Sequence, residues 1–365
     1  MVSNKEIVLL INSLGRGGAE GVFVTLANRL FEKNWQITLL VLHLEGAVRQ
    51  NELNPAIHCT VFNKKHARSS LFVLSRWLLV NKPEKILVFS HQLAVLLVML
   101  RFLLRKNIRI ISRNVNTLSV KKKNELSFWH KHVVHKLVSL FYRHVDLIIA
   151  QSNGMKDDLI SNYGICSSNI TIINNPVQKQ IENYLSNNIV LSKPNGNYIL
   201  CIGRLEYQKA FHYAIEAFNK ISLHYPMLRL KILGTGRQEA MLKQLVSDLN
   251  IADKVDFEGH QQDIVHYYFN ASLTMLTSLY EGFPNVLIES IALGTPVVSF
   301  DCPSGPNEII QEGVNGFLVR YQDADHLTEC LELALNRQWD PGLIIQTADK
   351  FSSSKILDEY EKVLA

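Results

Sequence analysis

Short apolar runs alternate with amphipathic stretches along the whole chain of 365 residues. The runs have the length of buried strands, and the stretches between most of them have the apolar spacing of helices. This pattern is typical of parallel βαβ units and argues against a β-sandwich or a helix bundle. Strands are predicted near residues 7–11, 37–42, 58–62, 86–89, 108–112, 146–150, 170–174, 198–202, 229–233, 255–258, 273–277, 296–300 and 316–319.

The alternation is interrupted once, at residues 181–197, where Asn, Ser, Pro and Gly are typical of a connector. We therefore predict an α/β fold of two tandem doubly wound, Rossmann-like domains, 1–180 and 181–350. Residues 351–365 include an amphipathic stretch that predicts a helix packing back across the domain junction. Ligands bind at the carboxyl ends of the strands in such sheets, so the site is expected in a cleft that the two domains face.

The net charge of +5 conceals a strong asymmetry between the halves. Residues 1–180 carry 24 Lys and Arg against 10 Asp and Glu, whereas residues 181–365 carry 14 against 23. A basic half joined to an acidic half predicts that only the first half meets an anionic partner. The sequence has no RNA- or DNA-binding motif, which argues against nucleic acid.

Cysteine usage and hydropathy indicate a compartment. The five cysteines are odd in number and share no metal-type spacing, as expected of buried thiols in a reducing environment. The longest apolar stretch, 93–104, is interrupted by Arg101 and is shorter than the ~20 residues of a spanning helix. We expect a cytoplasmic protein whose membrane contact is peripheral.

Three glycine-containing turns follow predicted strands. Glycine allows close backbone approach, and a helix N-terminus offers free amides to phosphate oxygens. The second turn adds two cations, which favours a diphosphate site, although tight packing of the turns is the alternative explanation. The residues concerned are Gly17, Gly18, Gly203, Arg204, Lys209, Gly234 and Gly236.

Two glutamates flank the start of a predicted helix at residues 278–289. Pro284 suits the first helical turn, which places Glu281 in the preceding loop and Glu289 within the helix. Glu289 lies in an apolar run, where an unpaired charge would be costly to bury. Sugar or ribose hydroxyls are suitable partners, because a carboxylate can accept from two neighbouring hydroxyls.

With these motifs the sequence resembles the glycosyltransferase family 4 group of retaining GT-B enzymes. The resemblance rests on Glu281 and Glu289 separated by seven residues, on Gly203-Arg204 with Lys209, and on the turn at 17–20, and it covers nearly the whole chain. It implies a GT-B fold and a nucleotide-diphosphate sugar donor, expected to be UDP-linked. The stretch 301–308 is similar to that of bacterial N-acetylgalactosaminyl-, galactosyl- and glucosyltransferases of surface-glycan and protein N-glycosylation pathways.

The resemblance also implies roles for residues of this chain. Arg204 and Lys209 would hold the donor diphosphate, Glu281 would contact the transferred sugar, and Glu289 would hold the ribose. Gly17 and Gly18 would close over the donor from the first domain. Backbone contacts to the sugar or phosphates would come from Gly282, Phe283, Pro284 and Asn285.

The expected mechanism needs no metal. Cleavage from UDP leaves negative charge on the β-phosphate, which cations and helix-end amides stabilise. The one Asp-x-Asp pair, Asp323 and Asp325, precedes an amphipathic stretch and is interpreted as a helix cap. In the family, retention is usually described as same-face attack in which the departing phosphate takes the acceptor proton, so no enzymic nucleophile is assigned.

In the first half, candidate residues follow two predicted strands. His91 has two interpretations: it lies near the donor sugar, or it caps or packs a helix. Contact of Arg113 and Asn114 with the acceptor phosphate is left open. The histidines of the stretch 129–135 lack the pattern of a zinc site and are interpreted as a helix face.

The segment from Arg101 to Arg143 mixes basic and aromatic residues, including Lys121, Lys122 and Lys123. Such a mixture suits an anionic bilayer surface, and a solvated basic face over a core helix is the alternative. Together with the basic first half, it favours a polyprenyl-diphosphate-linked acceptor and a peripheral position at the inner face of the plasma membrane.

Two other functions use the same motifs. A GT-B UDP-sugar epimerase or phosphorylase would have the same phosphate turns, and an inactive partner would bind nucleotide sugar or lipid without turnover. The glutamate pair and the full set of matched residues favour the transferase. The sugar, the acceptor hydroxyl and the oligomeric state are left open.

Overall fold

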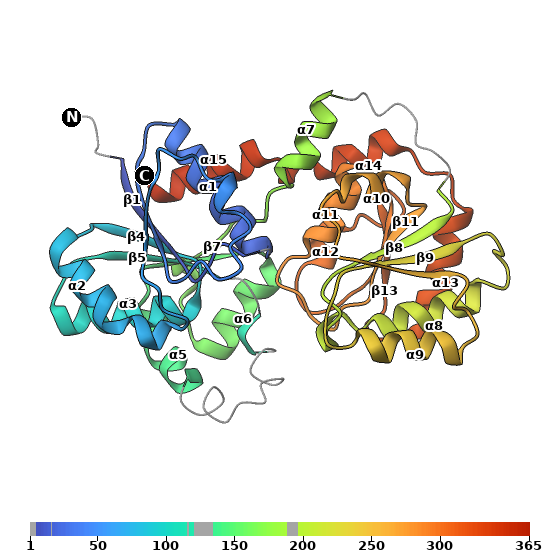
Figure 1. Cartoon of the computed structure of the whole chain (residues 1–365), viewed down its shortest axis with the longest axis horizontal. Helices are drawn as coiled ribbons and strands as arrows, with labels where there is room; N and C mark the ends of the chain where they lie inside the picture. Colours follow the sequence, from blue (N-terminus) through green and yellow to red (C-terminus); the bar gives the residue numbers. More distant parts are fainter. Residues whose placement is uncertain (1–4, 16, 115–116, 120–133, 188–195) are drawn as a thin grey trace. The chain divides into compact units, whose positions relative to one another are not determined.

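The computed structural model describes residues 5–15, 17–114, 117–119, 134–187 and 196–365. The chain divides into two compact units, Met1–Pro176 together with Ser354–Ala365, and Val177–Ser353 (Figure 1). The division falls close to the predicted boundary after residue 180. The last residues of the chain belong to the first unit.

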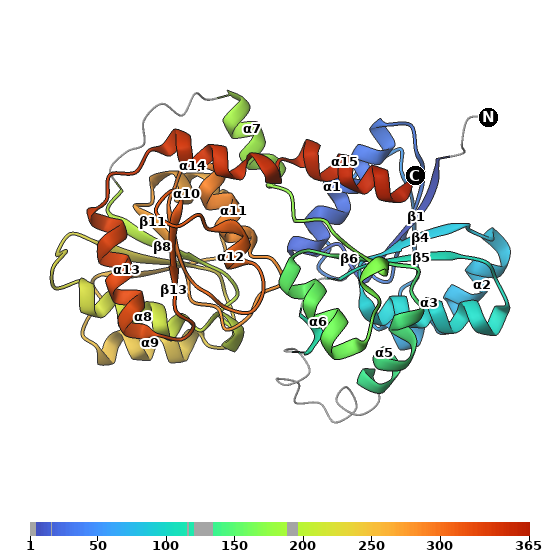
Figure 2. The same cartoon turned by 180° about the vertical axis from the view of Figure 1, so that it is seen from behind.

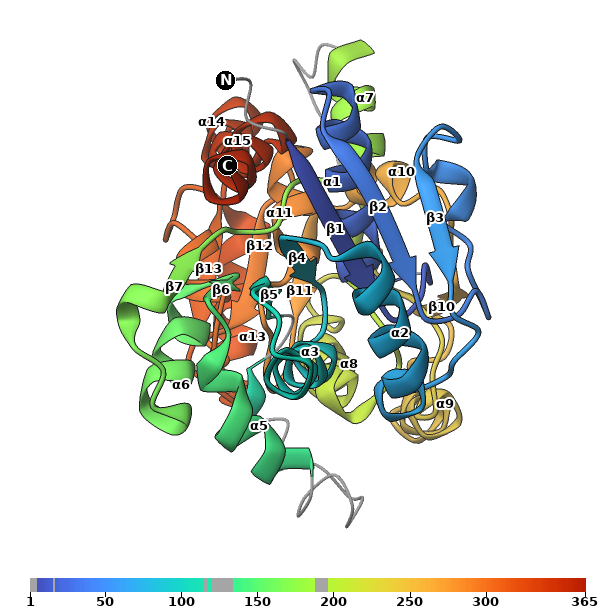
Figure 3. The same ribbon diagram turned by 90° about the vertical axis from the view of Figure 1, so that its left-hand side faces the viewer.

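A seven-stranded parallel sheet forms the centre of the first unit, in the order β3-β2-β1-β4-β5-β6-β7. Figure 3 shows β1 between β2 and β4. The strands are β1 (Glu6–Ile11), β2 (Gln36–Val41), β3 (His58–Val61), β4 (Lys85–Val88), β5 (Arg109–Arg113), β6 (Leu147–Ala150) and β7 (Ile170–Ile172).

Both faces of this sheet are buried. In β1, Val8 and Leu10 belong to one apolar core, whereas Ile7, Leu9 and Ile11 belong to the other, which explains why the strand is a continuous apolar run. Figure 2 shows the last helix, α15, beside α1. The described helices of this unit are α1 (Gly18–Glu32), α2 (Leu71–Asn81), α3 (His91–Leu104), α5 (His135–Phe141), α6 (Asn153–Tyr163) and α15 (Ser353–Leu364).

The second unit repeats the design with a six-stranded parallel sheet, in the order β10-β9-β8-β11-β12-β13. Its strands are β8 (Tyr198–Ile202), β9 (Arg229–Leu233), β10 (Val255–Gly259), β11 (Leu273–Leu276), β12 (Val297–Phe300) and β13 (Gly316–Val319). Its helices are α7 (Lys179–Asn187), α8 (Phe211–Ile221), α9 (Glu239–Asp248), α10 (Val265–Asn270), α11 (Asn285–Ala292), α12 (Pro306–Ile309), α13 (Ala324–Asn336) and α14 (Pro341–Ala348).

Every predicted strand is present, and the two parallel sheets confirm the predicted class of tandem doubly wound domains. One prediction is wrong: the first part of the expected connector is helix α7. Its apolar residues Ile181, Tyr184 and Leu185 lie on one helical face, and Ile181 is fully buried in the core of the second unit.

Candidate active site

The second unit changes its strand order between β8 and β11. β9 and β10 lie on one side of this point, and β12 and β13 on the other. A crevice for ligands opens at the carboxyl ends of two strands that meet in this way. The turn after β8 carries Arg204 and Lys209, and the loop after β11 carries Glu281, so the topology brings the predicted donor residues to one place.

The glycines of this region are required by packing. Gly203 donates its amide to the carbonyl of Leu233, and Leu205 donates to Thr235, so the turns after β8 and β9 lie backbone to backbone. A side chain on Gly234, which has φ +135°, would collide with the carbonyl oxygen of Gly203, and one on Gly236 would collide with that of Leu205. Packing thus accounts for these two glycines, and their contact with a phosphate stays a prediction.

The two cations of the β8 turn have different surroundings. Arg204 is exposed, and its guanidinium has no side-chain partner among the residues that the structure describes. The ammonium of Lys209 lies 2.6 Å from Oε1 of Glu281, and the side chains of this ion pair are only 15% and 10% exposed. Arg204 can therefore meet an anion directly, whereas Lys209 already has a counterion.

The loop that carries Glu281 is held by neighbours on both sides. Side chains of three residues donate hydrogen bonds to its backbone carbonyls: Gln208 to Tyr280 at 2.8 Å, Ser304 to Gly282 at 2.7 Å and Tyr321 to Leu279 at 2.8 Å. The loop between Leu276 and Asn285 thus has a fixed backbone, as a site for a charged substrate requires.

Helix α11 begins directly after this loop. Pro284 occupies the position before its first residue, Asn285, so the free amides of the helix start follow Glu281 closely, as the sequence predicts. The Phe283 side chain is buried and packs against Phe351 with ring centroids 5.5 Å apart. Any contact of Phe283 with a donor would therefore come from its backbone.

Glu289 is the fifth residue of α11 and is buried. Its carboxylate accepts hydrogen bonds from Nε2 of Gln178 at 2.6 Å and from the hydroxyl of Tyr268 at 2.8 Å. Burial raises the pKa of Tyr268 well above its usual range, and the adjacent Glu289 carboxylate adds to this, so the hydroxyl keeps its proton and donates. Protein side chains thus stabilise the charge of the Glu289 carboxylate. Its predicted contact with the ribose stays a prediction.

Sequence reasoning did not find several residues of this site. Gln208, Ser304 and Tyr321 position the loop, and Gln178 and Tyr268 hold Glu289, but each lies far along the chain from the residue it contacts. Only the placement of Gln208 beside Lys209 could have suggested a role. Ser278, in the same loop, has a buried hydroxyl with no hydrogen-bond partner in the described part of the chain.

The first unit changes its strand order between β1 and β4. The turn after β1 carries Gly17 and Gly18 at the start of α1, and His91 is the first residue of α3 after β4. A side chain on Gly17 would collide with the carboxylate of Glu20. The cap of α3 is Ser90, whose hydroxyl accepts from the Leu93 amide at 3.5 Å, so capping does not account for His91.

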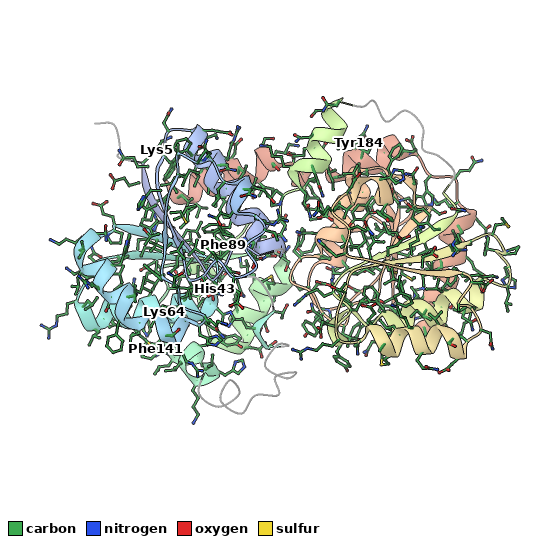
Figure 4. All side chains as sticks on the ribbon, viewed as in Figure 1. Lys5, His43, Lys64, Phe89, Phe141 and Tyr184 are labelled. Atoms are coloured by element: carbon green, nitrogen blue, oxygen red, sulfur yellow. The ribbon has the colours of Figure 1, made fainter. Side chains whose placement is uncertain are left out.

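Arg113 lies at the end of β5 and is fully buried, and its contact with an acceptor stays a prediction. Its Nε donates to the hydroxyl of Tyr360 in α15 at 2.8 Å, and one terminal nitrogen donates to Asn175. The guanidinium lies 5.2 Å from the ring centroid of Phe89, which is labelled in Figure 4. Arg113 thus joins β5 to the last helix, and Asn114 beside it is buried as well.

Part of the predicted basic segment lies outside the described residues, namely Lys121–Lys123 and the histidines His130 and His132. Within the described part, α3 packs against both α2 and α5. These helices leave large apolar side chains exposed, with basic residues nearby in the sequence. The exposed side chains are Phe72, Leu79, Val80, Phe102, Leu103 and Leu140.

A model of the Glycosyl transferases group 1 matches residues 185–353, and a model of Glycosyltransferase Family 4 matches residues 16–180. Together they account for nearly the whole chain, and both Gln178 and the Glu289 that it contacts lie within the matched residues. The chain belongs to glycosyltransferase family 4.

Relatives of this family 4 chain match it to different extents. An uncharacterized glycosyltransferase of Haemophilus influenzae is 33% identical over 48% of this chain, which spans about half (50%) of that relative's length. The N-acetylgalactosamine-N,N'-diacetylbacillosaminyl-diphospho-undecaprenol 4-alpha-N-acetylgalactosaminyltransferase of Campylobacter jejuni is 28% identical over 91% of this chain and 90% of its own.

A solved structure confirms the fold of the family 4 chain. Anabaena HepE, in a crystal structure with UDP-glucose, superposes with a TM-score of 0.76 at 19% identity, covering 98% of this chain and 99% of that one. This likeness supports the predicted GT-B class.

Asp323 accepts a hydrogen bond from the His326 amide at 2.9 Å and so caps α13, as predicted.

Neither a metal cluster nor a membrane-spanning helix is present among the described residues. They contain no group of three or more His, Cys, Asp or Glu side chains placed to hold a metal ion. No helix among them is both long and apolar enough to cross a bilayer.

Proposed function

We propose that this family 4 chain is a retaining glycosyltransferase that moves a hexose or N-acetylhexosamine from a UDP-sugar to a lipid-linked glycan acceptor in bacterial glycan assembly. The observation that carries the proposal is the convergence of Arg204, Lys209 and Glu281 at the β8/β11 switch point, directly before the amides of α11. Two relatives support it: the Campylobacter enzyme is named as a transferase of N-acetylgalactosamine to a diphospho-undecaprenol-linked sugar, and HepE crystallises with UDP-glucose.

Each group has a part in the proposed reaction. Cleavage of the bond between the anomeric carbon and the β-phosphate oxygen leaves negative charge on the phosphate. Arg204, Lys209 and the first amides of α11 stabilise this charge without a metal ion. Glu281 orients the transferred sugar through its hydroxyls, and Glu289 orients the ribose.

We propose retention by attack on the same face of the sugar, because family 4 enzymes are usually described in this way. The acceptor oxygen forms a bond to the anomeric carbon while the bond to the β-phosphate breaks. The acceptor's proton passes to the departing phosphate, so no side chain has to act as nucleophile.

The decisive experiment is a screen of UDP-glucose, UDP-galactose, UDP-N-acetylglucosamine and UDP-N-acetylgalactosamine against polyprenyl-diphosphate-linked acceptors. Mass spectrometry should detect addition of one sugar or more, and NMR of the anomeric proton should show the configuration of the donor. An inverted linkage would contradict retention.

The same screen separates the alternatives. Epimerised UDP-sugar without acceptor would identify an epimerase, and a free sugar phosphate formed with inorganic phosphate would identify a phosphorylase. Binding of UDP-sugar without turnover on any acceptor would identify an inactive partner.

The acceptor lipid implies a position at the inner face of the plasma membrane, and we propose that the first unit provides the contact. Phe102 and Leu103 near the end of α3 are 53% and 75% exposed, and Leu140 in α5 is 52% exposed. Arg105 and Lys106 follow them directly in the sequence. Apolar side chains beside cations suit an anionic bilayer interface.

We expect Leu103→Glu combined with Leu140→Glu to weaken binding to phosphatidylglycerol vesicles by tenfold or more, roughly the loss expected when two apolar side chains no longer enter the interface. Sedimentation with vesicles measures this. The matched control is Leu223→Glu with Met227→Glu, two residues of the second unit that are 81% and 79% exposed. Equal weakening in both pairs, or none in the first, would contradict the membrane proposal.

A further inference from the structure

The ion pair between Lys209 and Glu281 is built into the scaffold of the second unit. The carbonyl of Lys209 accepts a hydrogen bond from the Thr277 hydroxyl at 3.0 Å, and the amide of Glu281 donates to Pro303 at 3.3 Å. Gln208, the neighbour of Lys209, accepts from the Leu279 amide at 2.8 Å. Hydrogen bonds to neighbouring loops thus hold the backbone of both charged residues.

The pair is also largely removed from water, with side chains 15% and 10% exposed. Charges in such a place attract each other several times more strongly than charges in bulk solvent. An anion that reaches the Lys209 ammonium therefore meets a cation that is already neutralised. A second anion at this ammonium would therefore share its charge with the carboxylate of Glu281.

We propose that Glu281 is an internal counterion that competes with the donor diphosphate for Lys209. Under the proposed function, a complete UDP-sugar compensates Glu281 for the lost ion pair, because the sugar's hydroxyls donate hydrogen bonds to the released carboxylate. The product UDP has no sugar and offers no such compensation. Glu281 then returns to Lys209, which weakens the hold on UDP and favours its release.

This role differs from contact with the sugar alone, because it gives opposite effects on two ligands. Replacement of Glu281 by Gln keeps the size of the side chain and removes its charge, so Lys209 loses its counterion. UDP should then bind more tightly, while the bound UDP-sugar loses its carboxylate contacts. The ratio of UDP-sugar affinity to UDP affinity is therefore expected to fall.

The experiment is calorimetric titration of the full chain with UDP, with the UDP-sugar that the donor screen selects, and with inorganic pyrophosphate. Glu281→Gln should lower the Kd for UDP about tenfold, a change of about 1.4 kcal/mol. Lys209→Gln should remove this gain, so that the double variant Lys209→Gln with Glu281→Gln binds UDP no more tightly than Lys209→Gln.

A matched control separates a specific pair from general charge. Glu206→Gln removes one carboxylate from the same turn, where Glu206 accepts from the Arg237 amide at 3.5 Å and has no ion pair among the described residues. It should leave the Kd for UDP within about twofold of the wild type. Thermal melting of each variant confirms that the fold is intact.

The outcomes are distinguishable. An unchanged or higher Kd for UDP in Glu281→Gln would overturn the inference, and so would an equal gain in UDP affinity in Glu206→Gln. Neither result would contradict the proposed glycosyltransferase function. Failure of the wild type to bind any nucleotide would refute the proposed function, and a pyrophosphate gain confined to Glu281→Gln would then still support the counterion. If neither the wild type nor Glu281→Gln binds UDP, the UDP-sugar or pyrophosphate, both the proposed function and the counterion inference are refuted.

Discussion

At the scale of single residues, Glu281 and Lys209 are expected to matter more for turnover than for folding. We predict that Glu281→Ala and Lys209→Ala each lower kcat/KM by roughly 10²–10⁴-fold, because each removes a charge-assisted contact to the reacting donor. Steady-state kinetics with the selected donor measures this. Lys243→Ala is the control, since Lys243 pairs at 2.7 Å with Glu239 on the surface of α9. Near-normal rates in both site variants would refute the assignment.

The buried contact between Arg113 and Tyr360 is expected to contribute to the stability of the fold. The Arg113 guanidinium is fully buried, and its Nε relies on the Tyr360 hydroxyl. Tyr360→Phe should lower the free energy of unfolding by about 1–3 kcal/mol, because the buried donor loses its acceptor.

Urea unfolding followed by circular dichroism measures this loss. Tyr207→Phe serves as control, because Tyr207 is exposed and the change is the same removal of a hydroxyl. Equal stability of the two variants would show that the contact with Arg113 contributes nothing.

The residues predicted from sequence were those whose chemistry is local. Glu281, Glu289 and Lys209 stand in short motifs whose spacing places them at a loop or helix start. The burial of Arg113 was missed because its partner in α15 is separated from it by more than two hundred residues, and no periodicity reveals such a contact.

At the scale of elements, the glycine of the β9 turn should be essential. Gly234→Ala should destabilise the second unit and displace the turn that carries Arg204, since it combines a positive φ of +135° with a collision against the Gly203 carbonyl. Gly259→Ala is the matched control: its φ is +64° and nothing lies within 4 Å of the added carbon, so the expected cost is about 1–2 kcal/mol.

Thermal melting and UDP titration test this pair of variants. We expect the Gly234→Ala variant to melt at a clearly lower temperature than Gly259→Ala and to bind UDP more weakly. Comparable melting of both would show that the turns can separate without damage.

Central strands such as β6 and β8 were predictable because both faces of the sheet are covered there, which makes these strands short, continuous apolar runs. Helix α7 was not, because its polar residues and the Asn- and Ser-rich sequence after it are typical of a connector. Packing of Ile181 into the core of the second unit stabilises the helix, and local composition does not reveal such packing.

At the scale of the whole molecule, the last helix of the chain completes an apolar core of the first unit. Helix α15 buries Ile356, Leu357, Tyr360 and Leu364 in the core that β1 and α1 share. Lys33 of the first unit forms ion pairs with Asp358 at 2.8 Å and with Glu361 at 2.5 Å.

We predict that a chain ending at Ser352 has an unstable first unit. Four buried side chains are lost, each worth about 1.5–3 kcal/mol, and their sum is comparable with the whole stability of a domain. Sedimentation and thermal melting should show aggregation or early unfolding, and a synthetic peptide of residues 353–365 should restore part of the stability. Wild-type melting of the shortened chain would contradict this.

The same helix has a consequence for biosynthesis. Ribosomes deliver about 5–20 residues per second, so the segment after Pro176 takes roughly 10–35 s to emerge before Ser354 appears. Throughout that interval the nascent first unit has an uncovered apolar surface where α15 will lie, and chaperones that shield such surfaces have their longest opportunity there.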